Sequence, residues 1–206
     1  MSVEELLFEV TGALRVPVLL LALGCLALAV VELGTLIGEQ LRRRRRSLHR
    51  LDRVADEARA ALARGDGGAA AYLVRQIAFS RPMADALDAV VEQHGRPDAE
   101  DRIAKRLAEY DYTAVRRLER TRILVRLGPA LGLMGTLIPL SPALAGLARG
   151  DVARLTEDLR VAFGITVVGL LAGAIAFAVS LVRDRLYAQD YSDVEYLAAR
   201  LAREPA

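Results

Sequence analysis

The apolar residues of the chain fall into three blocks, and most of the charged residues lie between the first block and the second. Two of the blocks, 127–148 and 161–182, are 22 residues long and contain no charged residue. As helices they would be about 33 Å long, which matches the roughly 30 Å hydrocarbon core of a bilayer. The first block, 16–38, is interrupted by a single charged residue, Glu32. The pattern predicts three transmembrane helices, of which the second and third form a hairpin.

The first block is expected to remain in the mature chain as a membrane span. The charged residues before it are mostly acidic, with Arg15 as the one positive charge, and the run Arg42–Arg46 follows it closely. A cleaved signal peptide has a basic start and a shorter apolar region. The arginine run is instead typical of a residue cluster that fixes membrane orientation, and it would also attract anionic lipid headgroups.

The distribution of arginines predicts the orientation of the three spans. Positive residues that flank membrane helices remain on the cytoplasmic side. Arginines cluster after the first span, before the second and after the third, whereas 149–160 balances three arginines against three acidic residues. We therefore expect 1–15 and 149–160 to be external, and 39–126 and 183–206 to be cytoplasmic. The protein would be a multi-pass protein of the inner or plasma membrane.

The segment between the first two spans predicts a helical domain. Apolar residues recur at spacings of three and four, and glycine or proline clusters separate the periods. We expect short helices near 51–62, 69–79 and 83–93. A longer helix would begin near Asp98 and run without a break into the second span, and 184–203 would extend the third span. The fold class is therefore all-α, with long helices extending from spans two and three.

Composition argues against an enzyme, a metal site and a nucleic-acid-binding protein. The chain has one cysteine, Cys25, and only two histidines, both outside the apolar blocks, so no metal cluster or disulfide framework is expected. Ser141 and Ser180 have no histidine or lysine within the spans to act as a base. The arginine run lacks the interleaved aromatic residues of a nucleic-acid site. No cofactor is predicted.

Each arm of the predicted hairpin carries one threonine among glycines, Thr136 in the second span and Thr166 in the third. A single threonine in a membrane helix usually bonds the carbonyl one turn earlier. Two threonines on adjacent antiparallel helices favour a shared polar surface, because a hydroxyl both donates and accepts hydrogen bonds. A threonine hydroxyl does not titrate, so the acid that carries protons would have to come from another protein.

Several further residues are candidates for helix packing or for accessory acid chemistry. Small residues at a spacing of four allow membrane helices to approach closely. Glu32 is the only ionisable residue inside a predicted span. It could pair with Arg42 or reach the interface, or it could serve as an intramembrane functional carboxylate. The packing candidates are Gly128, Gly132, Gly135, Gly169 and Gly173, and the acidic candidates are Glu32 and Asp158.

The hairpin resembles the MotA/TolQ/ExbB proton channel family. The resemblance covers about 126–183 by motif and the whole chain by its three-span topology, which is that of the ExbB/TolQ branch. The motifs are Gly132-Leu133-Met134-Gly135-Thr136 in the second span and Ile165-Thr166-Val167-Val168-Gly169-Leu170 in the third, followed by Ala172-Gly173-Ala174.

The resemblance implies a homopentamer whose second and third spans line a central pore. Inside the pore would lie the membrane helices of a dimeric, single-span partner that resembles ExbD or TolR and carries the proton-accepting aspartate. Thr136 and Thr166 match the pore-lining threonines of the family. Proton flux would then drive rotation or displacement of the partner.

The chain departs from the ExbB/TolQ pattern at two places. Those proteins carry a glutamate five residues before the third-span threonine, where this chain has Val161. Asp158 and Glu157 lie about one turn earlier and could substitute for it. Pro139 and Pro142 are also unlike the usual second span. Two other functions remain open: a non-conducting membrane scaffold in which both threonines only pack, and a secondary transporter subunit with Glu32 as the coupling carboxylate.

Overall fold

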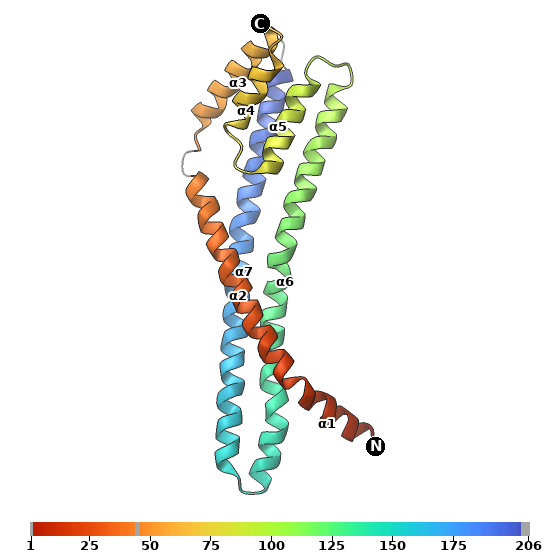
Figure 1. Cartoon of the computed structure of the whole chain (residues 1–206), viewed down its shortest axis with the longest axis vertical. Helices are drawn as coiled ribbons and strands as arrows, with labels where there is room; N and C mark the ends of the chain where they lie inside the picture. Colours follow the sequence, from red (N-terminus) through yellow and green to blue (C-terminus); the bar gives the residue numbers. More distant parts are fainter. Residues whose placement is uncertain (1, 44–45, 203–206) are drawn as a thin grey trace. The chain divides into compact units, whose positions relative to one another are not determined.

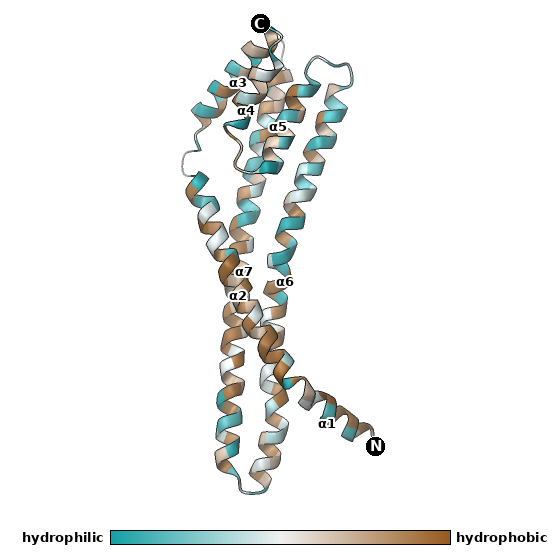
Figure 2. Cartoon of the chain, viewed as in Figure 1, coloured by the Kyte–Doolittle hydropathy of each residue, from teal (hydrophilic) through white to brown (hydrophobic). Residues whose placement is uncertain are grey.

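The computed structural model describes residues 2–43 and 46–202, and within them every regular element is an α-helix (Figure 1). This confirms the all-α prediction. Three helices are long and apolar enough to cross a membrane, and they contain the three predicted spans. Figure 2 shows that hydrophobic residues dominate most of α2. The helices are α1 (Val3–Ala13), α2 (Arg15–Arg43), α3 (Leu48–Ala63), α4 (Gly67–Arg75), α5 (Arg81–Gln93), α6 (Ala99–Ala148) and α7 (Val152–Ala202).

The chain divides into two compact units, and the three long helices contribute to both. The membrane unit comprises Met1–Thr35 and Glu119–Leu181. The helical domain comprises Leu36–Leu118 and Val182–Ala206. Each unit has its own hydrophobic core, and we describe the two separately.

The membrane unit is built from α1, most of α2 and the hairpin of α6 and α7. Small residues of α2 supply much of its buried core, and larger aliphatic residues of the hairpin pack with them. Because the buried residues of α2 recur every three or four positions, they form one face of that helix. The buried core residues are Val18, Ala22, Cys25, Ala29, Leu124, Leu131, Ile138, Ile165, Ala172 and Ala176.

The helical domain packs α3, α4 and α5 with the first half of α6 and the last part of α7. Its largest fully buried side chains are those of Met83, Leu87, Leu197, Leu201 and Val194, together with Val74. Helices α4 and α5 begin at hydrogen-bonding caps: the Asp66 side chain accepts from Ala69 N, and that of Ser80 accepts from Met83 N. Such caps satisfy backbone donors that the first turn of a helix leaves free.

The connection between α6 and α7 is much shorter than the predicted loop 149–160. Helix α6 ends at Ala148 and α7 already begins at Val152. Gly150 adopts a φ of +78°, a conformation that favours glycine, and it makes the turn. The balanced charges of 149–160 indicated solvent exposure, but charge alone does not interrupt a helix. Charged residues from Arg154 onward therefore lie on the first turns of α7.

Two further features differ from the simplest expectation. The segment 1–15 contains the helix α1, which starts with a reciprocal capping box between Ser2 and Glu5. Helix α6 remains continuous through Pro129, Pro139 and Pro142. A proline in a helix removes one backbone donor, and membrane proteins tolerate this loss when neighbouring groups satisfy the freed carbonyl.

Candidate functional site

Helices α6 and α7 approach so closely that several glycines of the hairpin have no room for a side chain. A Cβ atom added to Gly128 would lie 2.6 Å from the Gly169 carbonyl oxygen and 2.8 Å from the Gly173 nitrogen. A Cβ on Gly132 would lie 3.2 Å from the Thr166 carbonyl oxygen. These neighbours are backbone atoms, which cannot move aside as a side chain can. The close approach of the two backbones therefore depends on these glycines.

Gly135 differs from the other hairpin glycines in what surrounds it. A Cβ there would meet the side chain of Ile165 and no backbone atom among its three nearest neighbours. Gly164, on the other arm, has nothing within 4 Å of the place a Cβ would take. The closest contact between the two backbones thus lies around Gly128, Gly132 and Gly169, just before Thr136 along α6.

Both candidate threonines lie beside this contact and are half-buried in the single chain. The Thr166 hydroxyl oxygen is 3.1 Å from the carbonyl oxygen of Ala162, one turn earlier, and 3.1 Å from that of Gly132 across the interface. The Thr136 hydroxyl donates to the Leu133 carbonyl at 2.7 Å. A hydroxyl has one proton to donate, so each donated bond leaves the oxygen lone pairs able to accept.

The two threonines lie away from the core that α2 shares with the hairpin. At 3.6 residues per turn, Thr136 is about 140–160° around α6 from Leu131 and Ile138, which belong to that core. Thr166 is about 100–120° around α7 from Ile165 and Ala172, which also belong to it. The hairpin therefore has one side that packs with α2 and another side that carries the threonines.

The register of the hairpin offsets the two uncharged stretches along its axis. If 127–148 and 161–182 were level, the start of the first would face the end of the second. Gly128 instead lies against Gly173, about two and a half turns before Val182. At the other end, Gly146 lies near Asp151. The two stretches, as read from the sequence, cannot both be centred in one bilayer.

Asp158 forms an ion pair with the first residue of α2. Arg15 Nη2 lies 2.8 Å from Asp158 Oδ1, and the Asp158 side chain is only 8% exposed whereas that of Arg15 is 42% exposed. Within the described residues, the second carboxylate oxygen, Oδ2, is buried and has no hydrogen-bond partner. Glu32, the other acidic candidate, is half-buried in α2.

The helical domain contains polar contacts that sequence reasoning missed. Arg43 makes a two-pronged ion pair with Asp190, with Nη2 at 2.8 Å from Oδ2. The Tyr110 hydroxyl lies 3.4 Å from the same oxygen, and the Arg43 guanidinium lies 5.3 Å from the centre of the Phe79 ring. The side chains of Arg43 and Asp190 are 8% and 1% exposed. Burial raises the pKa of Asp190, although the Arg43 guanidinium opposes the shift.

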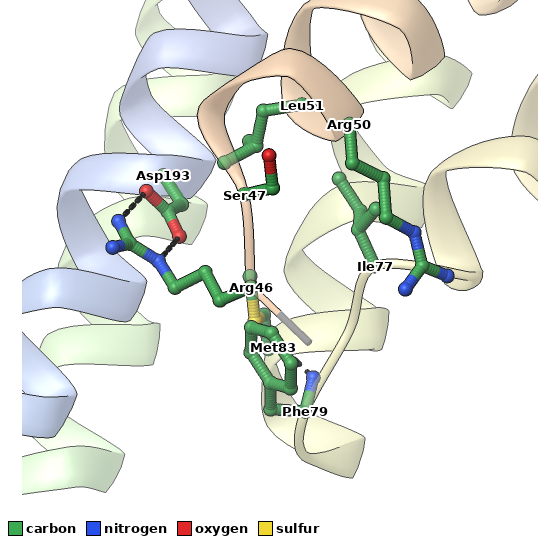
Figure 3. Close-up of a pocket in the computed structure, with 8 residues that line it drawn as sticks. All are labelled: Arg46, Ser47, Arg50, Leu51, Ile77, Phe79, Met83 and Asp193. Atoms are coloured by element: carbon green, nitrogen blue, oxygen red, sulfur yellow. Dashed lines mark hydrogen bonds and ion pairs between the residues drawn. The ribbon is translucent and has the colours of Figure 1, made fainter. Parts of the chain in front are cut away.

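Arg46 makes a second ion pair of the same kind, with Asp193 (Figure 3). Its Nε lies 2.7 Å from Oδ2 and its Nη2 lies 2.5 Å from Oδ1. The cavity beside this pair is about 10 Å³, close to the smallest space that holds one water molecule. It is therefore no site for a larger ligand.

These ion pairs change the interpretation of the arginine run. Arg43 and Arg46 were expected to set orientation and to attract lipid headgroups, but their side chains bind carboxylates of α7. Arg44 and Arg45 lie outside the described residues. The sequence did contain a signal, since the two arginines and the two aspartates, Asp190 and Asp193, share a spacing of three residues. Asp190 and Asp193 lie one turn apart on α7 and so on one face of it, whereas Arg43 ends α2 and Arg46 lies beyond that helix.

The sequence profile of the MotA/TolQ/ExbB proton channel family matches residues 75–194 of this chain. The match covers more than half of the 206 residues, including all of α6 and both threonines. The chain belongs to the MotA/TolQ/ExbB proton channel family, as its motifs indicated. It is a multi-pass membrane protein of a non-enzymatic channel family, and membership implies a partner of the ExbD/TolR type. No individual curated protein matches the chain closely enough to be set beside it.

Proposed function

We propose that the chain is the channel-forming subunit of a proton-driven motor of the ExbB/TolQ kind. Several copies of the chain would enclose a central lumen, and the family resemblance implies that there are five. A dimeric single-span partner of the ExbD/TolR type would place its membrane helices in this lumen. Protons crossing the membrane on the partner's carboxylic acid would then drive the partner to rotate or shift.

The observation that carries the proposal is the placement of Thr136 and Thr166 on one side of the hairpin, opposite the side that packs with α2. Both threonines are half-buried in the single chain, so each retains some exposed surface. Each hydroxyl already donates its proton to a backbone carbonyl, so its oxygen can only accept a further hydrogen bond from a neighbouring group. A protonated carboxylic acid needs an acceptor of this kind when it enters an apolar channel, because an unpaired polar group there is unfavourable.

The register of the hairpin supports a specific depth in the bilayer for Thr136 and Thr166. The Arg15–Asp158 ion pair sets the start of α2 level with Asp158, so the uncharged residues of α7 begin at about the same level as those of α2. Thr166 is five residues beyond Val161, or about 7.5 Å into the bilayer. We place the threonines in the outer part of the membrane, with the N-terminus outside and the C-terminus in the cytoplasm.

If the threonines lie at this depth, α6 leaves the outer side of the hydrocarbon before the end of the uncharged stretch 127–148. Gly135 lies against Ile165, so the level of Val161 on α7 corresponds to about Pro139 on α6. The rest of α6, from Ser141 to Ala148, and the first turns of α7 would then extend beyond the hydrocarbon. This arrangement keeps the charged residues at the start of α7 out of lipid, where they would be unfavourable, although it sets Arg126 of α6 level with uncharged residues of α7.

Replacing Thr166 with valine tests the channel. Valine keeps the shape of threonine and removes the hydroxyl, so partner-dependent proton flux into vesicles should fall at least tenfold while the assembly purifies intact. Thr166→Ser is the matched control, because it retains the hydroxyl, and it should retain most of the flux. Unchanged flux in Thr166→Val, with the serine variant equally active, would contradict the channel.

A non-conducting scaffold is the second candidate function, and one observation favours it. Both hydroxyls have carbonyl partners within the chain, so each threonine is satisfied without water or a partner's acid. A scaffold predicts that neither Thr136→Val nor Thr166→Val changes partner-dependent flux, and that wild-type flux is at the level of empty vesicles. The same vesicle assay therefore separates the two candidates.

A further inference from the structure

A cavity of about 490 Å³ lies between the N-terminal helix and the hairpin of the membrane unit. We call it the α1–α6 cavity. Its walls come from α1, from the first residue of α2 and from one turn of α6. The lining residues are Leu7, Phe8, Thr11, Gly12, Arg15, Ile138, Ser141 and Pro142. The cavity therefore has apolar walls and a few polar groups, which is the usual composition of a small-molecule site.

The cavity lies at the edge of the hydrocarbon region. Arg15 is the last charged residue before the uncharged part of α2, and it is paired with Asp158 on α7. On α6, Pro142 and Ser141 come just beyond the level at which the uncharged part of α7 begins. Ile138 lies about 160° around α6 from Thr136, so the cavity opens on the side of the hairpin away from the threonines. A ligand there would come from the surrounding lipid.

The polar groups of the cavity are donors suited to a phosphate. An arginine carries five N–H donors, and within the described residues Arg15 uses only Nη2, in its bond to Asp158. The Arg15 side chain is 42% exposed, so its remaining donors are accessible. Ser141 is exposed, and its hydroxyl makes no hydrogen bond among the described residues. Arginine and hydroxyl donors together bind phosphate oxygens well.

Apolar residues of α1 and its C-cap form a stripe about 120° around the helix from the residues that line the cavity. Val3, Leu6, Val10 and Leu14 recur at helical spacing, and each is at least 44% exposed. Glu5 and Glu9 lie on the opposite side of the helix from this stripe. A helix with one apolar and one acidic face, joined directly to a membrane span, is typical of a segment that lies in the membrane interface. Lipid therefore borders α1, the helix that forms one wall of the cavity.

We propose that the α1–α6 cavity binds a phospholipid from the leaflet in which α2 begins. The phosphate accepts hydrogen bonds from Arg15 and Ser141, and part of an acyl chain packs on Leu7, Phe8 and Ile138. The bound lipid fixes α1 against the hairpin. The leaflet is the outer one if the orientation given under Proposed function holds, but the site itself requires only that α2 spans the membrane.

Gly12 offers a way to fill the cavity without disturbing the fold. It lines the cavity, and a Cβ added to it would meet nothing within 4 Å. Gly12→Leu therefore places a side chain in the space that the acyl chain needs. Gly24→Leu is the matched control: Gly24 is also free of neighbours within 4 Å but lies in α2, outside the cavity.

The experiment counts the lipids retained by the purified, intact assembly. The protein is delipidated in detergent and incubated with phosphatidylethanolamine or phosphatidylglycerol, and native mass spectrometry then gives the number bound per chain. Gly12→Leu and Arg15→Gln should each reduce retained lipid at least fivefold, whereas Gly24→Leu should not. Asp158→Asn leaves the Arg15 cation in place and should retain at least as much lipid as the wild type.

Retention by Gly12→Leu equal to that of the wild type would overturn the proposal. So would equal loss in Gly12→Leu and Gly24→Leu, since the loss would then not depend on the cavity. If a neighbouring copy fills the cavity in the assembly, the intact assembly retains no specific lipid in any variant, and that result would also overturn it. Because the readout is lipid and not proton flux, it stands or fails independently of the channel proposal.

Discussion

The contacts that stabilise the membrane unit internally differ in kind from those that stabilise the helical domain. In the membrane unit, glycine backbones of α6 and α7 touch directly, and the core with α2 consists largely of small residues. In the helical domain, large side chains such as Met83 and Leu87 fill the core, and buried ion pairs join Arg43 and Arg46 to α7.

The difference follows from the solvent around each unit. Lipid is as apolar as a leucine side chain, so burying large apolar residues does not drive membrane helices together, and close backbone packing must do so. In water, the hydrophobic effect makes burial of large apolar side chains favourable, and this stabilises the helical domain. Water also allows charged residues to be present near its core, provided that each is paired.

The largest effect should come from breaking the buried ion pair of the helical domain. Asp190→Ala leaves the Arg43 guanidinium buried with its main partner removed, and such a loss typically destabilises a protein by about 3–5 kcal/mol. We expect the helical domain to lose helicity at lower denaturant concentration, as followed by circular dichroism of the whole protein. Asp98→Asn is the control, since its pair with Arg102 is exposed and should contribute little.

The double variant Arg43→Met/Asp190→Leu sharpens this test. It removes both charges and replaces them with apolar side chains, so most of the lost stability should return. If the double variant is no more stable than Asp190→Ala, then the unpaired charge is not the cause of the destabilisation.

The next largest effect should come from adding single methyl groups to the hairpin glycines. Gly169→Ala and Gly128→Ala force a Cβ into backbone atoms and should each destabilise the membrane unit by about 1–3 kcal/mol. Gly135→Ala should also destabilise the unit, because its Cβ would meet Cγ2 and Cβ of Ile165, which are held close to the α7 backbone. Gly164→Ala meets nothing and serves as the control. Unfolding in mixed micelles with increasing dodecyl sulfate would rank them, and equal stability of Gly164→Ala and Gly169→Ala would contradict the backbone contact.

The sequence predicted the membrane unit better than it predicted the connections within it. The glycine and threonine motifs are local in sequence, and they identified the hairpin and its family. The register of the hairpin depends on Gly150, which makes a turn of only a few residues, whereas the charges around it suggested a longer loop. As a result, the sequence pattern predicts that all of 127–148 lies in the bilayer, although the contacts of Gly128 offset this stretch from 161–182.

The ion pairs of the helical domain were harder to predict, because they join residues far apart in sequence. Arg43 and Asp190 are separated by 147 positions. From the sequence, an arginine beside a membrane span has an adequate explanation in membrane orientation, so nothing required it to have a protein partner. The matching spacing of Arg43 with Arg46 and of Asp190 with Asp193 becomes informative only when α7 is known to extend past both aspartates.

A smaller effect should appear in the pH dependence of the helical domain. Burial raises the pKa of Asp190 in the folded state, so the folded state holds that proton more tightly than the unfolded state does. The contribution of this group to stability is fully present below its unfolded pKa of about 4 and is lost as the pH rises through its folded pKa. Asp98 has the opposite sign, because hydrogen bonding by Arg102 lowers its pKa. Its contribution is present above pH 4 and is lost as the pH falls.

Carboxyl carbon chemical shifts, measured by NMR on selectively labelled protein, would separate the two groups. Asp190 should titrate at a higher pH than Asp98. In Arg43→Met the pKa of Asp190 should rise further, because the guanidinium that opposes the effect of burial is gone. A titration of Asp190 below that of Asp98 would show that the ion pair outweighs burial and would reverse the predicted slope.

The smallest effect should come from removing a threonine hydroxyl from the membrane unit. Thr136→Val loses the bond to the Leu133 carbonyl, but that carbonyl lies in a helix and retains a backbone donor nearby. Side-chain hydrogen bonds in membrane proteins contribute only about 0.6 kcal/mol on average, so the stability in mixed micelles should change by no more than about this amount. If the same variant abolishes proton flux, the hydroxyl acts on the conducted proton and not on the packing. A destabilisation as large as that of Gly169→Ala would instead place Thr136 among the residues that hold the hairpin together.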